Sequence, residues 1–105
     1  MRVVDNLAII TNTIRKMHPQ AQIYLFGSYA NGDPHMDSDI DLCVVVPSLE
    51  RNRFEIMDEI REAIHDKTEF AIDLLLFSNV EFEKNSVQKS KIQYEIAQNG
   101  VLLDA

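Results

Sequence analysis

Helical and strand-like hydrophobic periodicity alternate along the whole chain, with no internal repeat, low-complexity stretch or linker to divide it. A length of 105 residues, 46% of them hydrophobic, allows one real core and leaves no room for a second domain. We therefore expect residues 1–105 to form a single domain. The order helix, strand, turn, strand, helix, strand, helix, helix predicts an α/β or α+β fold with a small mixed β-sheet flanked by helices.

Four segments carry helical signals. The first begins after Asp5, read as its N-cap, and runs to Pro19 with apolar residues at helical spacing: Leu7, Ile10, Ile14 and Met17. A charged amphipathic helix follows and ends near His65, with a predicted inward stripe of Phe54, Met57, Ile60 and Ile64. Ser78 and Glu81 have capping-box spacing and predict a short helix. A last helix passes through Ile92 and Ile96 and is expected to end at Asn99-Gly100.

Three segments read as strands. The first, Gln22 to Phe26, is closed by Gly27, and a turn-rich passage then runs to Ser38. The second is the apolar series Asp39 to Val46, ended by Pro47 and Ser48. The third is Glu69 to Phe77. The sequence therefore predicts three strands.

Charge and cysteine content restrict the cellular compartment and the classes of binding partner that we expect. Ten basic against seventeen acidic residues give a net charge of -7, which argues against an extended nucleic-acid surface. The lysines Lys84, Lys89 and Lys91 are interpreted as a solvated helix face. The single Cys43 can form no internal disulfide, and no apolar run approaches the ~20 residues of a membrane span. We expect a cytoplasmic protein with no membrane association.

Two aspartates interrupt the second strand. Residues two apart on a strand face the same side, so Asp39 and Asp41 are expected side by side while Ile40 and Leu42 face the other way. Aspartate is depleted in strands and costly to desolvate beside apolar neighbours. A divalent cation would compensate this charge, and carboxylate oxygens suit Mg²⁺ held together with substrate phosphates.

A third aspartate also interrupts an apolar strand. Asp73 interrupts the apolar strand Phe70 to Leu76, and if that strand neighbours the second one, three carboxylates converge. Such a cluster would repel itself without a metal, whereas one or two Mg²⁺ ions would make it a phosphoryl-transfer site. The alternative is that Asp39 and Asp41 are solvated edge-strand acids and Asp73 a strand-end acid.

A glycine-serine pair supplies the other half of the predicted site. Gly27 follows a strand and Ser28 opens a turn, where backbone N–H groups and a hydroxyl can hold a triphosphate. A Walker P-loop is excluded because Asp33 stands where its lysine belongs, and an EF-hand loop is excluded by Leu42 and Ser48. The histidines form no spaced zinc set, and the roles of Tyr29 and His35 stay open.

Together, Gly27-Ser28, a ten-residue spacer and Ser38-Asp-Ile-Asp-Leu42 resemble the signature of the polymerase-beta-like nucleotidyltransferase superfamily, in particular its minimal stand-alone members. The resemblance spans nearly the whole chain, since Asp73 falls where the third family carboxylate belongs and the ending Ile96–Leu103 is also similar. It implies that Asp39, Asp41 and Asp73 bind two Mg²⁺ ions and are catalytic, and that Gly27 and Ser28 bind the nucleotide. Many members carry a basic residue where this chain has Asn31.

The same resemblance implies an activity and a partner. Such a protein would transfer AMP from ATP to a hydroxyl acceptor, with a tyrosine of a HEPN-domain toxin as the preferred acceptor, and would act as an antitoxin. Two alternatives stay open: a binding module that holds Mg-ATP without turnover, and a stand-alone transferase acting on a small molecule such as an aminoglycoside. The relatives that modify small molecules usually carry a second, helical domain. The acceptor, the preferred base and the oligomeric state are not fixed by the sequence.

Overall fold

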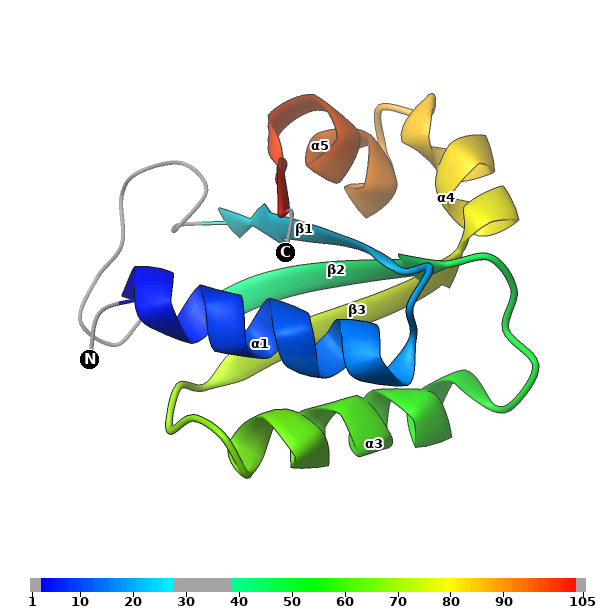
Figure 1. Cartoon of the computed structure of the whole chain (residues 1–105). Coiled ribbons are helices and arrows are strands. Elements are labelled where there is room, and N and C mark those ends of the chain that lie inside the picture. The colour runs from blue at the N-terminus through cyan, green and yellow to red at the C-terminus, as the bar shows by residue number, and fades with distance from the viewer. Residues whose placement is uncertain (1–2, 28–38, 104–105) are drawn as a thin grey trace.

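The computed structural model describes residues 3–27 and 39–103, with side chains from residue 6 onward, and contains a four-stranded sheet with helices on both faces (Figure 1). Its elements, in chain order, are α1 (Val3–Met17), β1 (Gln22–Phe26), β2 (Ile40–Val46), α3 (Arg53–His65), β3 (Ile72–Ser78), α4 (Asn79–Ser86), α5 (Ile92–Asn99) and β4 (Val101–Leu103). The predicted α+β architecture with a mixed sheet is confirmed.

The sheet has the strand order β3-β2-β1-β4. β1 is antiparallel to both β2 and β4, whereas β2 and β3 are parallel and are joined by the crossover helix α3. Parallel neighbours require such a crossover, because a tight hairpin can join only antiparallel strands. β4 was not among the predicted elements, and it forms one edge of the sheet beside β1.

The strand β2 is buried on both faces, which explains its nearly continuous apolar sequence. On one face, Ile40, Leu42, Val44 and Val46 join the core cluster under α1 and α3. On the other, Cys43 and Val45 pack with Phe77, Phe82 and Ile96 under α4 and α5. Figure 1 shows the two helix pairs on opposite sides of the sheet. Since alternate residues share a face, Asp41 belongs to the α4–α5 side.

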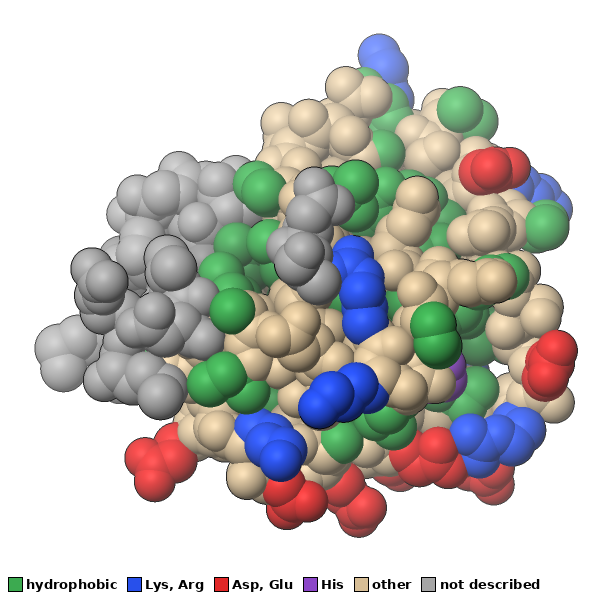
Figure 2. All heavy atoms as spheres, in the orientation of Figure 1, with side chains coloured by type: hydrophobic (Ala, Val, Ile, Leu, Met, Phe, Trp, Pro, Cys, Tyr) green, Lys and Arg blue, Asp and Glu red, His purple; other side chains and the backbone are tan. Residues whose placement is uncertain are grey.

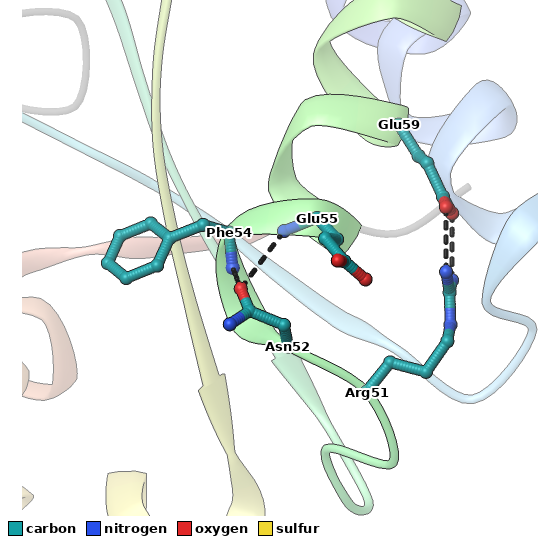
Figure 3. Close-up of polar contacts among 5 residues, drawn as sticks. All are labelled: Arg51, Asn52, Phe54, Glu55 and Glu59. Carbon is teal, nitrogen blue, oxygen red and sulfur yellow. Dashed lines mark hydrogen bonds and ion pairs between the residues drawn. The ribbon is translucent and has the colours of Figure 1, made fainter.

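The helix α3 ends at His65, as the sequence predicts, but it has a different inward stripe. The Asn52 side chain is its N-cap and accepts hydrogen bonds from the backbone N–H of Phe54 (2.9 Å) and Glu55 (3.4 Å) (Figure 3). The buried residues are Ile56, Met57, Ile60 and Ile64, and the Phe54 side chain, expected inward, is 67% exposed. At about 100° per residue, Phe54 lies about 60° beyond Met57 and outside the stripe that faces the sheet.

Several helix boundaries also test the predictions. α1 begins at Val3, so Asp5 lies inside the helix and is not its N-cap. The α4 capping box is confirmed: Ser78 Oγ accepts from the Glu81 N–H at 3.2 Å, and the Glu81 carboxylate accepts from the Ser78 N–H at 3.0 Å. The three lysines are exposed but do not share one helix face, because Lys84 lies in α4, Lys89 in the following turn and Lys91 at the start of α5.

The outer surface of α3 is acidic. Its exposed carboxylates are those of Glu55, Asp58, Glu59 and Glu62, and Figure 2 shows acidic side chains along the lower edge of the view, where Figure 1 places α3. Arg51 neutralises one of them through a bidentate pair with Glu59 at 2.7 and 2.8 Å (Figure 3). Within residues 3–27 and 39–103, no helix is both long enough and apolar enough to span a membrane.

Candidate active site

Asp41 and Asp73 lie side by side at one end of the two parallel strands. The register pairs Asp41 of β2 with Asp73 of β3, flanked by the pairs Ile40–Ile72 and Leu42–Leu74. Adjacent strands are about 4.8 Å apart, and register partners project to the same side of the sheet. The condition for convergence of the carboxylates, that the third strand neighbours the second, is therefore met, and Asp41 and Asp73 are adjacent.

Asp39 lies just outside the strand in which it was predicted. β2 begins at Ile40, whose N–H donates to the Ala71 carbonyl at 2.9 Å, so the ladder with the β3 side starts one residue after Asp39. The Asp39 side chain is exposed, as is that of Asp73, and Asp41 is half-buried. Asp39 thus lies in an exposed position just before β2, and Asp41 lies two residues further along the chain in a half-buried position.

The pKa of the Asp41 carboxyl is shifted by burial and by its acidic neighbours. Burial raises its pKa, and the negative charges of Asp73 and then Asp39 raise the pKa further. Each of these causes disfavours the ionised form, and like charges in one site act in this way. All three predicted carboxylates are therefore close enough to be coupled, with Asp41 receiving the repulsion of both others.

This donor set has the chemistry of a hard-cation site. Among the residues that the structure describes, no group of three or more His, Cys, Asp or Glu side chains is gathered closely enough to hold a metal ion. The donors are nevertheless carboxylate oxygens, which Mg²⁺ prefers, and the raised pKa of Asp41 shows negative charge that a cation would offset. These residues therefore fit magnesium by the chemistry of their donor atoms.

Gly27 packs directly against Asp41. The residue before it, Phe26, is the register partner of Asp41 across the antiparallel β1–β2 pair. Gly27 has a φ of +72°, and a Cβ placed on it would overlap Asp41 Oδ2 and lie 2.9 Å from Asp41 Cγ. A side chain is thus excluded twice, by backbone conformation and by the neighbouring carboxylate. The sequence indicated only that a glycine lets a phosphate approach, and it gave no signal of this contact.

The predicted nucleotide-binding residue Ser28 lies outside the described residues, as do Tyr29, Asn31 and His35. The expectation that Ser28 holds a triphosphate therefore stays a prediction. Cys43, by contrast, is described: it is fully buried, and burial raises the pKa of its thiol to about 12. A thiol in that state is neither a nucleophile nor a metal ligand at neutral pH, so it takes no part in the site.

Two cavities differ in their relation to these residues. The larger, about 390 Å³, is lined by His18, Val46 and Arg51 among others and lies at the opposite end of β2 from Asp41. A smaller one, about 250 Å³, is lined by Gly27 and Phe26 together with residues of α5. The smaller cavity borders the candidate site, because Gly27 lines it. The sequence did not single out its α5 residues, since nothing in their spacing indicates that α5 lies beside Gly27.

The chain was compared with known families, curated proteins and solved structures. The model of the nucleotidyltransferase domain family matches residues 7–102. No curated protein matches significantly. A protein of Sulfolobus solfataricus assigned as a nucleotidyltransferase is similar in fold, with a TM-score of 0.65 and 24% identity over 96% of this chain and 78% of that one.

Two further similar structures are toxin-antitoxin systems. One, crystallised with AMP-PNP, has a TM-score of 0.61 and 25% identity over 91% of this chain and 70% of that one. The other is a tyrosine-to-alanine mutant of the toxin-antitoxin MntA-HpeT, with a TM-score of 0.60 and 25% identity over 93% of this chain and 71% of that one.

Proposed function

The chain belongs to the nucleotidyltransferase domain family, and from this premise we propose that it transfers AMP from ATP to a hydroxyl group on a partner protein. In this proposal Asp39, Asp41 and Asp73 are catalytic and hold Mg²⁺, while Gly27 and Ser28 bind the triphosphate. The partner is a HEPN-domain toxin, the acceptor is a tyrosine, and the modification makes this chain an antitoxin.

One observation carries the assignment of the site. Asp41 and Asp73 are register partners on parallel strands, and Gly27 is packed onto Asp41 from the other side. Gly27, which is expected to bind phosphates, therefore lies against the carboxylates that are expected to hold a cation. A triphosphate is itself a Mg²⁺ ligand, so such a meeting point suits phosphoryl-type transfer better than either half would alone.

The proposed reaction forms one bond and breaks one. The acceptor oxygen attacks the α-phosphorus of ATP, the bond from that phosphorus to the β-bridging oxygen breaks, pyrophosphate leaves, and the hydroxyl proton passes to water. When bound, Mg²⁺ would neutralise charge on the triphosphate and lower the pKa of the acceptor hydroxyl. Asp41 is the most enclosed of the three acids, Asp73 lies beside it on β3, and the exposed Asp39 precedes β2.

Charge and size favour a protein acceptor. The net charge is -7, and the outer face of α3 is acidic, so a polynucleotide would be repelled over much of the surface. A cavity of about 250 Å³ beside Gly27 is too small to enclose both a nucleotide and a second small molecule. A partner surface can complete the acceptor side, and two solved structures of similar fold are toxin-antitoxin systems.

The test is transfer of label from ATP. The purified chain is incubated with Mg²⁺ and ATP labelled at the α-phosphate, with and without the protein encoded beside it. We expect little labelling alone and a labelled neighbour in the mixture, with mass spectrometry locating AMP on a tyrosine. Asp73→Asn should abolish the label, whereas the matched control Asp66→Asn, an exposed acid at the end of α3, should retain it.

Other results would favour the other candidate functions. Efficient transfer to an aminoglycoside with no protein present would overturn the antitoxin proposal in favour of a stand-alone transferase. Tight Mg-ATP binding with no transfer to any acceptor would indicate a binding module. Full labelling by Asp73→Asn would remove Asp73 from the catalytic site.

A further inference from the structure

The small cavity beside Gly27 is lined by Phe26, Gly27, Ile92, Glu95, Asn99 and Gly100 and has a volume of about 250 Å³. It lies between the end of β1 and the helix α5, and Figure 1 shows α5 over β1 on one side of the sheet. We propose that this cavity receives the nucleoside part of the nucleoside triphosphate, and that Glu95 and Asn99 recognise its hydrogen-bond donors. This inference rests on the proposed function and extends it to the recognition of the substrate.

The position of the cavity follows from strand register. Phe26 and Asp41 are register partners, and the α4–α5 side of the sheet carries Tyr24 and Phe26 as well as Cys43 and Val45. Asp41 and the cavity therefore share one face and one end of the sheet. The ribose is bonded to the α-phosphate that reacts and carries the base, so the nucleoside must lie close to the carboxylates, and this cavity adjoins them through Gly27.

The size of the cavity restricts which part of the nucleotide it can hold. Pockets that enclose a drug-sized ligand have volumes of roughly 300–1,000 Å³. A volume of about 250 Å³, just below this range, suits a nucleoside and not a whole nucleoside triphosphate. The carboxylate of Glu95 also disfavours phosphate in this space, because two anions would repel. The cavity thus complements the neutral part of the substrate.

The lining combines apolar walls with a polar pair. Phe26 and Ile92 are apolar, and Ile92 is 44% exposed at the first residue of α5, where a flat base would cover it. Asn99 Nδ2 donates to Glu95 Oε1 at 2.9 Å across one helical turn. This bond orients both side chains and leaves a carboxylate oxygen of Glu95 to accept from a ribose hydroxyl or an exocyclic amine, groups that acidic side chains bind elsewhere.

The experiment compares ATP with inorganic tripolyphosphate, which lacks a nucleoside. Both are titrated calorimetrically, with Mg²⁺, into the native chain and into Glu95→Gln, Asn99→Ala and Ile92→Ser. We expect each variant to bind ATP about tenfold more weakly, the effect of losing one hydrogen bond to a charged group or one apolar contact. Tripolyphosphate binding should not change. Gln98→Ala, an exposed neighbour on α5 outside the cavity, should bind both ligands as the native chain does.

Two nucleotide analogues separate the possible donors. If the Glu95→Gln penalty disappears with 2′-deoxy-ATP, the carboxylate binds the ribose, and if it disappears with ITP, which lacks the exocyclic amine, it binds the base. Either result supports the inference. Unchanged ATP binding in all three variants would overturn it, as would an equal loss of ATP and tripolyphosphate. Failure of the native chain to bind ATP would instead refute the proposed function itself, so the two failures are distinguishable.

Discussion

The contact between Gly27 and Asp41 makes a quantitative prediction about coupling between two residues. In Gly27→Ala the new methyl group meets the Asp41 carboxylate, and the backbone must hold an alanine at a φ of +72°. The left-handed conformation costs an alanine about 1–2 kcal/mol. Forcing a group into an occupied space costs a further 1–3 kcal/mol, roughly, since the Asp41 side chain must leave its place.

The two contributions separate in a double-mutant cycle. In an Asp41→Ala background the overlapping carboxylate is gone, and the nearest remaining Asp41 atom to the new methyl, its Cβ, lies at 3.3 Å. Gly27→Ala should then cost only the conformational part. We expect Gly27→Ala to destabilise the native chain by about 2–5 kcal/mol and the Asp41→Ala chain by about 1–2 kcal/mol, so the coupling energy is about 1–3 kcal/mol.

Urea denaturation of the four proteins in a chelating buffer, followed by circular dichroism, gives each free energy of unfolding. The chelator keeps metal binding out of the comparison. An Asp66→Ala background is the control, because Asp66 is the C-cap of α3 and is not among the nearest neighbours of a Cβ placed on Gly27. Equal costs of Gly27→Ala in the native and Asp41→Ala backgrounds would refute the packing of Gly27 on Asp41.

Three further predictions concern residues that the structure describes. Since the folded-state pKa of Asp41 is raised, its charge destabilises the metal-free fold at any pH above the unfolded-state pKa. Asp41→Asn should therefore raise the free energy of unfolding at pH 7. Urea titrations at several pH values should show that this gain disappears as the pH falls through both pKa values. Cys43 should react with a thiol reagent only after unfolding, because its thiol is buried with a pKa of about 12; prompt reaction in the native state would contradict this burial. Phe54→Ala should change stability by less than about 0.5 kcal/mol and Ile60→Ala should cost about 2–5 kcal/mol, and the reverse order in denaturation would show that α3 is rotated.

Local signals in the sequence predicted most of the elements. The capping box of Ser78 and Glu81 satisfies backbone groups within one turn, so its spacing alone is informative, and the structure contains it. The apolar runs of β2 and β3 likewise identified Asp41 and Asp73 as acids within strands, and the structure shows that these strands are neighbours. Phe54 was misplaced because Phe54, Met57, Ile60 and Ile64 recur at helical spacing and resemble one inward stripe. Only packing against the sheet decides which edge of the stripe is covered.

Features that depend on distant pairing were not predictable. β4 has only three residues, Val101–Leu103, which is too short for a period to show, and it exists because it pairs with β1. The contact of Gly27 with Asp41 requires the antiparallel register of β1 and β2, and the cavity beside α5 requires the same helix to lie over β1. The sequence thus identified Gly27 as a candidate site residue, but it did not indicate that the absence of a side chain leaves room for the Asp41 carboxylate.

The short strand β4 has a consequence for the order in which the molecule assembles. It pairs Leu25 with Val101 and Ile23 with Leu103, and Arg15 donates to the Leu103 carbonyl across 88 positions of sequence. During synthesis, β1 therefore keeps an open edge until residues 101–103 have left the ribosome, although β2 and β3 are already available. Three residues also make the weakest ladder of the sheet, so this strand should detach first in local opening events, and each detachment turns the strand that leads into Gly27 into a free edge.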